Sequence, residues 1–478
     1  MTLSILLTFF SSLIAIPDTS IHTTVEAQAI VSDAGVTPFW MRSLQYGSVP
    51  MENPGLVLRA WNGKNYNLKK KYDWKYEVEA TGWTGKQNDF WLTQAYVSGR
   101  RGKWELWAGR RKEVYGLGDT TMTAGFYAWS GNALPMPKVQ LGTRDYLNFA
   151  KGWLGVHMTY SHGWFDNQGP VIDAYLHQKT FYGRIGKSTS KINLFGGINH
   201  NVSWGGEAKV KVGNGNWFDY YPSNLNTYFY VITLLKDRSI LPTDPNSSGD
   251  DLAYQFGNHL GSIDIAIKFQ SKILEVLTYR QSIYETGRIA ALTQINDGLS
   301  GISIKIKRSS LIENLGFEYL YTANQGSYTS GISQFLGLKD PHAGEIESYQ
   351  NNGGRGSWKY WNKTLGTPLF ILDRESKNGG GNYFSLNAIK SFHMYFAGHL
   401  PFNLVWKARF SNSYYAMPKG NYQKRLGKSD FVLQNSLYFS IEKLFLTKYY
   451  SKIQFGLDKG SRFNDSIGMS LSINYKLN

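Results

Sequence analysis

Residues 467–478, IGMSLSINYKLN, alternate between apolar side chains and small or polar ones. The apolar set is Ile467, Met469, Leu471, Ile473, Tyr475 and Leu477. A period of two residues is typical of a β-strand with one apolar face and one polar face. We therefore expect this segment to be a strand that separates an apolar environment from a wet one.

Segments with the same period recur along the whole chain. In residues 72–81, aromatic and aliphatic side chains alternate with Asp73, Lys75, Glu77 and Glu79. A strand that is buried on both sides in a soluble core would be apolar on both faces. Further alternating runs are residues 154–161, 192–199, 263–270 and 302–307. The sequence shows nothing comparable at a helical period, so it predicts an all-β protein.

Turn-rich segments of different lengths separate these runs. The long ones, rich in Gly, Asn, Pro and charged residues, are 243–251, 339–368 and 374–382. Short turns that alternate with long loops are typical of outer-membrane β-barrels. The alternative, a soluble β-sandwich, needs two inner faces that meet and edge strands that are protected. The regular charges on the polar faces favour the barrel.

We therefore expect a single domain, residues 21–478, that forms a closed antiparallel transmembrane β-barrel with short periplasmic turns and longer extracellular loops. About ten residues cross the membrane per strand, so the length accommodates about 18 strands, or fewer strands with larger loops. Closure would pair the last strand with an early one, near residues 25–32. Met469, Leu471, Ile473 and Tyr475 would then face lipid, and Ser470, Ser472 and Asn474 the lumen.

Composition agrees with a barrel and excludes several other classes. Mean hydropathy is −0.35, hydrophobic residues make up 42%, and no apolar run reaches the ~18 residues of a spanning helix. Aromatic residues reach 15%, and the chain has 50 glycines. The absence of cysteine excludes disulfides, thiolate catalysis and thiol-bound metals.

The first residues predict export. Leu3–Ile16 is an apolar stretch of signal-peptide length that is followed by Pro17. We expect residues 1–20 to be a signal peptide that is cleaved between Ala15 and Ser20, with Ala27–Ala29 as the alternative site. Together with the barrel pattern, this predicts the outer membrane of a Gram-negative cell.

Five stretches resemble, in order along the chain, the Wzi capsule-assembly family in the form found in Bacteroidetes. They are residues 100–119, 129–146, 183–206, 284–304 and 351–369. GNALPMPK (131–138) and SWKYWNKTLGTPL (357–369) are the most distinctive parts. The resemblance implies an outer-membrane barrel of about 18 strands that holds capsular polysaccharide at the cell surface, as a lectin-like binder and not as an enzyme.

Signatures of catalysis and of metal binding are weak in the sequence. It has no G-x-S-x-G, H-E-x-x-H or P-loop motif. His157, Thr159 and Ser161 share the polar face of one predicted strand, where we expect a hydrogen-bonded lumenal histidine. Residues 244–255 begin like a calcium loop, but the twelfth position is Gln255, so we expect a solvated loop. We predict no catalytic residue, no cofactor and no metal.

The formal charge is +16, and some of the basic residues occur in clusters. These are Lys69–Lys71; Arg100, Arg101 and Lys103; Arg110–Lys112; and Lys419, Lys424, Arg425 and Lys428. One interpretation is neutralisation of lipid and lipopolysaccharide head groups. The other is a landing surface for an acidic polysaccharide, whose carboxylates Arg binds in a bidentate manner. For an exported strand-rich chain we do not expect nucleic acid as a partner.

Two groups of aromatic residues lie among Pro, Gly and Asn, which membrane-spanning strands tolerate poorly. Sugars stack on aromatic faces while amides and charges bind their hydroxyl groups. The candidate polysaccharide-binding residues are Tyr127, Trp129, Asn132, Lys138, Arg355, Trp358, Tyr360, Trp361 and Asn362. Buried loops folded into the barrel mouth would contain the same residues, so both interpretations stay open.

The leading hypothesis is a non-enzymatic outer-membrane barrel that binds or anchors capsular or extracellular polysaccharide. The alternatives are a porin for solutes and a scaffold for envelope assembly machinery. An open or closed lumen distinguishes the first two.

Overall fold

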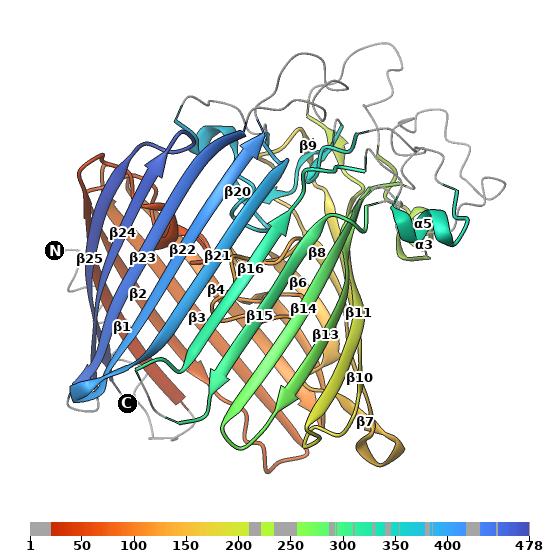
Figure 1. Cartoon of the computed structure of the whole chain (residues 1–478), viewed down its shortest axis with the longest axis horizontal. Helices are drawn as coiled ribbons and strands as arrows, with labels where there is room; N and C mark the ends of the chain where they lie inside the picture. The colour runs from red at the N-terminus through yellow and green to blue at the C-terminus, as the bar shows by residue number, and fades with distance from the viewer. Residues whose placement is uncertain are drawn as a thin grey trace.

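The structure is a computed structural model that describes residues 21–209, 221–233, 256–285, 292, 294–308, 311–326, 330–339, 346–352, 354–377, 383–384, 386–416, 431–445 and 448–477. It is a barrel of tilted antiparallel strands (Figure 1). The predicted signal peptide, the calcium-like loop and the basic cluster at 419–428 lie outside the described residues.

Nineteen strands form the barrel sheet, and β6 and β7 occupy one position because both pair with β8, so the barrel has 18 strand positions. The strands are β1 (Ile21–Ser32), β2 (Gly55–Lys64), β3 (Tyr72–Gly85), β4 (Asp89–Arg101), β5 (Trp104–Arg110), β6 (Pro137–Thr143), β7 (Leu147–Phe149), β8 (Leu154–Trp164), β10 (Tyr175–Ile185), β11 (Ile192–Trp204), β13 (Asn258–Gln270), β14 (Leu274–Glu285), β15 (Gly298–Ile306), β16 (Asn314–Tyr321), β21 (Ile389–Leu400), β22 (Leu404–Ala416), β23 (Phe431–Phe445), β24 (Tyr449–Gly460) and β25 (Ser466–Lys476).

Short elements lie in the connections between these strands. They are α2 (Phe39–Arg42), η1 (Ala150–Gly152), β9 (Val171–Ile172), β12 (Glu207–Ala208), α3 (Leu225–Thr233), α5 (Gly331–Phe335), β17 (Asn351–Asn352), β18 (Gly356–Ser357), β19 (Lys359–Tyr360), β20 (Lys363–Thr364), η4 (Asp373–Glu375) and η5 (Pro401–Asn403). None of the helices within the described part of the chain has the length and apolar character needed to cross a membrane.

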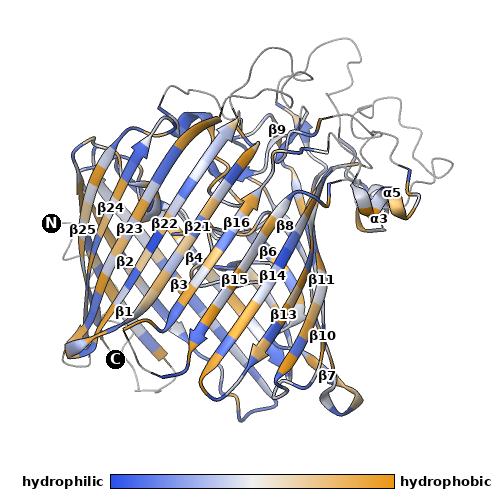
Figure 2. Cartoon of the chain, viewed as in Figure 1, coloured by the Kyte–Doolittle hydropathy of each residue, from blue (hydrophilic) through white to orange (hydrophobic). Residues whose placement is uncertain are grey.

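The pairing of β1 with β25 closes the barrel, as the sequence predicted. The register runs from Val25 opposite Tyr475 to Ser32 opposite Gly468. The side chains of Met469, Leu471 and Ile473 are 54%, 49% and 53% exposed on the outer wall, whereas Ser470 and Ser472 are buried in the lumen. Both the partner strand and the assignment of faces are therefore confirmed. The same alternation follows the other strands around the outer wall (Figure 2).

The two ends of the barrel differ in the length of their connections. At one end, the short-turn end, the strands are joined by residues 65–71, 102–103, 186–191, 271–273 and 401–403, and β25 also ends there. The opposite end, the long-loop end, carries the described parts of residues 33–54, 111–136, 205–257 and 322–388. At the short-turn end, exposed aromatic side chains form an outer girdle: Trp74, Trp104, Phe149, Trp153, Phe445 and Tyr449. Such a girdle is typical of a membrane interface.

A charge on the outer face of β25 should destabilise the barrel strongly. Leu471 lies in the middle of the strand, so L471K would place an ammonium group in the hydrocarbon layer, at an expected cost of about 2–4 kcal/mol. N474K is the matched control, because position 474 faces the lumen opposite Glu26. Reversible urea unfolding in lipid vesicles measures both variants. Equal stabilities would contradict the assignment of faces.

Candidate functional site

Three long-loop connections fold into the lumen and occupy it, apart from the cavity described below. We call the described parts of residues 33–54, 111–136 and 346–387 the plug. Their side chains form most of the main hydrophobic cluster of the molecule, which includes Trp40, Phe126, Tyr127, Trp358 and Phe370. The core of this protein therefore lies inside the barrel, and the wall strands enclose it.

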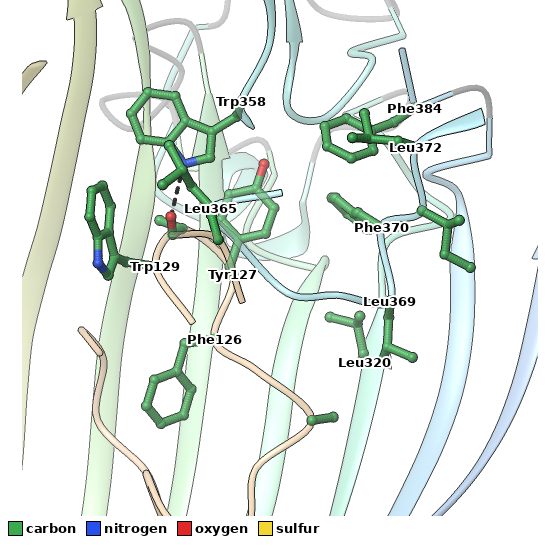
Figure 3. Packing of buried hydrophobic residues seen from close by; sticks show 14 of the residues in the cluster. Phe126, Tyr127, Trp129, Leu320, Trp358, Leu365, Leu369, Phe370, Leu372 and Phe384 are labelled. Carbon is green, nitrogen blue, oxygen red and sulfur yellow. Dashed lines mark hydrogen bonds between the residues drawn. The ribbon is translucent and has the colours of Figure 1, made fainter. Parts of the chain in front are cut away.

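The second and third plug segments hold each other directly (Figure 3). The indole N–H of Trp358 donates to the carbonyl oxygen of Ala128 at 2.8 Å. The backbone N–H of Ser130 donates to the carbonyl of Leu365 at 2.9 Å, and the Asn132 amide donates to that of Thr364. Figure 3 shows Trp358, Leu365, Tyr127 and Trp129 converging from the two segments.

The first plug segment joins this assembly through α2. The backbone N–H of Phe39 donates to Asp458 Oδ2 on β24 at 2.7 Å, and the Trp40 indole N–H donates to Ser411 on β22. Arg42 pairs with Glu375 of the third segment at 2.9 Å. Although burial raises the pKa of the Glu375 carboxyl, the Arg42 and Lys363 charges outweigh that effect, and the pKa is lowered overall.

Buried acidic side chains of the wall anchor the plug. Glu318 accepts hydrogen bonds from Thr123 Oγ1 (2.7 Å), the Ala124 backbone N–H (2.6 Å) and the Tyr279 hydroxyl (2.5 Å). Tyr279 reaches Glu318 across β15, where the glycine at 301 leaves room for its ring: a Cβ there would lie 2.3 Å from the ring. A buried carboxylate needs such donors, because desolvation is otherwise costly.

Two further acidic side chains of the barrel wall accept hydrogen bonds from the plug. Asp264 accepts from the backbone N–H of Leu117 at 3.0 Å. Glu285 accepts from the backbone N–H of Gln350 at 2.6 Å and from the hydroxyl of Tyr127. Burial, and then the Glu285 charge, raise the pKa of Tyr127 well above its usual value, so this hydroxyl keeps its proton. The wall therefore fixes the plug by hydrogen bonds to its backbone as well as its side chains.

Asp297, at the long-loop end, should make the stability of the folded chain depend on pH. It accepts from the Tyr349 hydroxyl and from the backbone N–H groups of Gln325 and Asn324, and burial raises its pKa to about 7. An unfolded aspartate ionises near pH ~3.9, so the folded chain holds this proton more tightly. Stability should fall as pH rises from about 4 to about 7, and then level off. Melting temperatures of wild type and D297N across this range test it, because the difference between them should follow that curve.

The structure brings the two predicted aromatic groups together, but it buries most of them. Seven of the nine candidates are at most 8% exposed: Tyr127, Trp129, Asn132, Lys138, Arg355, Trp358 and Tyr360. This is the arrangement that the sequence left open as the alternative, loops folded into the barrel mouth. A role of these residues in polysaccharide binding stays a prediction.

Trp361 and Asn362 are the candidates with partly exposed side chains. They form the tip of the β19–β20 hairpin, where both have positive φ (45° and 58°). A bulky tryptophan rarely adopts that conformation. The Trp361 ring packs edge-on against Trp91 of β4, with 4.7 Å between ring centroids.

Lys138 is fully enclosed by polar and aromatic partners. Its ammonium lies 2.8 Å from Glu113 Oε2 and 2.8 Å from Gln178 Oε1. It also lies 4.6 Å from the ring centroid of Trp129, which is a cation–π contact. The charge of Lys138 is therefore paired with groups inside the barrel.

Three of the four basic clusters do not lie on the long-loop surface. Lys69–Lys71 and the cluster of Arg100, Arg101 and Lys103 both lie at the short-turn end. Arg111 and Lys112 point into the lumen, where they pair with Glu105 (2.6 Å) and Glu79 (2.5 Å). These clusters therefore give no support to a landing surface for acidic polymer among the long loops.

The lumenal polar group at His157 also has structural partners. Thr159 shares a hydrogen bond with Thr180 at 2.7 Å, and the Ser161 hydroxyl donates to the carbonyl of Gln178. The predicted lumenal position of these residues is confirmed, and their hydroxyl groups are used in pairing between β8 and β10. Among the described residues, no cluster of His, Asp and Glu could hold a metal ion.

A cavity of about 350 Å³ remains in the lumen between the first plug segment and the wall. Strands β1, β2, β3, β24 and β25 form its other sides. Its polar and charged lining residues include Gln28, Arg59, Glu79, Lys112, Lys452 and Gln454. Three aromatic rings, those of Tyr46, Trp61 and Tyr450, also line it. A lining of this kind is compatible with water or with a sugar residue.

Comparisons with known proteins bear on the fold. No family model and no curated protein sequence matches the chain. Among solved structures it is similar to Wzi of Escherichia coli, described as a carbohydrate-binding β-barrel involved in group 1 capsule assembly, with 13% identity, a TM-score of 0.60, and coverage of 98% of this chain and 87% of that one. OprD of Pseudomonas aeruginosa matches less closely, with 10% identity, coverage of 96% and 94%, and a TM-score of 0.44. The fold is that of an outer-membrane β-barrel.

Proposed function

We propose that this chain is a distant member of the Wzi capsule-assembly family, located in the outer membrane of a Gram-negative cell, where it binds and anchors capsular or extracellular polysaccharide without catalysis. The observation that carries the proposal is the structural likeness to a carbohydrate-binding barrel, which extends over 98% of the chain. The five sequence stretches that resemble the family support it independently.

The filled lumen favours a binder over a porin. A barrel of this size leaves an aqueous channel unless something plugs it. Here the plug is held by backbone and side-chain hydrogen bonds to Glu318, Asp264 and Glu285. A fixed plug leaves the loop end as a surface where a polymer too large for the lumen can bind.

The hairpin tip is the part of the predicted site best placed to meet such a polymer. The Trp361 side chain is partly exposed, whereas Trp358, three residues earlier, is buried. Stacking of an aromatic face on a sugar ring needs an accessible indole. Substitution of Trp361 should therefore weaken polysaccharide binding, whereas substitution of Trp358 should act mainly on stability.

The test is binding of purified surface polysaccharide from the source organism to the full chain in detergent. We expect wild type to bind, and W361A to bind at least several-fold more weakly, with a smaller loss of melting temperature than W358A because Trp361 is only partly buried against Trp91. W358A is the matched control and should lower the melting temperature, because it empties a buried site. No binding by the wild type to capsule or to released exopolysaccharide would reject the proposed function. Undiminished binding by W361A would reject only the site.

A further inference from the structure

Four histidines and a lysine occupy outward-facing positions on neighbouring strands near the long-loop end. They are His162 on β8, His177 and Lys179 on β10, His200 on β11, and His259 on β13. Their outward direction follows from strand alternation: Phe181, Leu194 and Ile265, at equivalent positions of the same strands, are 51%, 44% and 60% exposed. Polar and charged side chains on a lipid-facing wall are costly unless something covers them.

The helix α3 contacts this polar patch at His162, His177 and Lys179. His177 and His200 are fully buried and His259 is 1% exposed, although all three lie on the outer side of the wall. The Tyr228 hydroxyl lies 2.7 Å from that of Tyr160 and 3.4 Å from His177 Nδ1. The ammonium of Lys179 donates to the carbonyl oxygen of Ile232 at the end of the helix.

The two sides of α3 differ in what they contact. Thr227, Tyr230 and Val231 face the wall and are buried, and Tyr230 and Val231 pack with Val202, Trp204 and Phe256. On the opposite side, Leu225 is 85% exposed and Phe229 is 50% exposed, beside the exposed and uncharged Asn226 and Thr233. The helix, LNTYFYVIT, contains no acidic or basic residue. A helix that faced water on that side would be expected to carry charged residues there and not a large aliphatic and an aromatic side chain.

We propose that α3 lies in the outer-leaflet interface of the membrane, with Leu225 and Phe229 among the lipid chains and its other side sealing the polar patch from lipid. The patch begins close to the strand ends: His177 and Lys179 follow Tyr175, the first residue of β10, by two and four positions. At ~3.3 Å per residue this is about 7 and 13 Å along the strand, which suits an interfacial depth.

The apolar side of α3 is continuous with the lipid-facing wall. Tyr160 and Trp164 of β8 are each 42% exposed, and aromatic residues of this kind mark membrane interfaces. In Figure 1, α3 and α5 lie outside the wall on the side of β10, β11 and β13. The helix α5 and the residue after it also expose apolar side chains, with Phe335 at 89% and Leu336 at 55%. The absence of charge on α3 fits lipid chains better than a polar protein surface.

The chain has no cysteine, so single labels can be placed without background. An environment-sensitive fluorophore on F229C is compared with one on I267C, on the lipid-facing wall, and one on Q87C, in the connection at the loop end. The full chain is reconstituted in phosphatidylcholine vesicles that contain lipids brominated near the carbonyl end of the chain. We expect a loss of emission for F229C comparable to that for I267C, and no loss for Q87C.

Quenching of the F229C label by aqueous iodide, without quenching by brominated lipid, would overturn the proposal. So would a disulfide between two F229C chains whose label escapes the lipid quencher, because that result assigns this face to a second copy. Unchanged thermal melting of each labelled variant shows that the barrel is intact, and neither result bears on polysaccharide binding.

Discussion

Replacing residues 111–136 and 323–388 with two-residue turns is expected to convert an electrically silent barrel into an open channel. The wall strands allow this change. Arg110 and Pro137 are register partners, and so are Tyr321 and Lys390, so each replacement leaves an ordinary hairpin. The lumen of an 18-strand barrel is wide enough to conduct water and ions once it is emptied.

Planar-bilayer recordings measure the effect. Wild type should show no stable conductance, each single replacement a small or unsteady one, and the double replacement steady open channels. The first plug segment stays in place in all variants, held by Asp458 and Ser411, so the channel should remain narrower than the full lumen. Steady conductance in the wild type would contradict a closed lumen and would favour the porin.

Loss of the Lys138 charge should be the most damaging single change inside the lumen. K138M leaves the carboxylate of Glu113 buried without its 2.8 Å ion pair. The remaining cation beside it is Arg111, whose Nε lies 3.9 Å from Glu113 Oε1. Removing one partner of a buried ion pair costs about 3–5 kcal/mol, because the remaining charge stays desolvated. We expect that loss in the free energy of unfolding, measured with urea in lipid vesicles.

The double variant K138M/E113Q is the matched control, since it removes both charges and should recover most of the stability. This pair of variants also separates two roles for Lys138. If Lys138 bound saccharide, K138M would lower polysaccharide affinity without lowering stability. If Lys138 instead holds β6 to the plug, K138M should lower stability without a separate loss of polysaccharide affinity. Equal stability of K138M and wild type would contradict this structural role.

Strand alternation is a local property, and this is why so much of the fold could be predicted. Met469 and Ser470 are adjacent in sequence and face opposite media, so their order alone indicates which side is lipid. The pairing of β25 with β1 followed from the need to abolish free edges. The direction of successive strands also determines which connections share one end, and it places Lys69–Lys71 and the cluster of Arg100, Arg101 and Lys103 together at the short-turn end.

The interior of the barrel could not be predicted in the same way. Trp129 and Trp358 lie among Gly, Pro and Asn, a composition that exposed and buried loops share. Glu318 and Asp264 occupy polar-face positions like many others, and their partners Thr123 and Leu117 lie 195 and 147 residues away in sequence. A packed loop is defined by such distant contacts, and a single sequence carries no local signal for them. The polar patch under α3 shows the same difficulty, since the alternation places those histidines outward but says nothing of what covers them.

The closure of the barrel has a consequence for biogenesis. Gln28 on the first strand bonds to Gln454 across a separation of 426 residues, and Phe39 of the plug is held by Asp458 on the second-last strand. Contacts of such range form only after nearly all of the chain has emerged, and they make folding slow. The N-terminal plug segment therefore cannot form its native contacts until the last two strands have folded. We expect the machinery that inserts the barrel to protect this apolar segment until then.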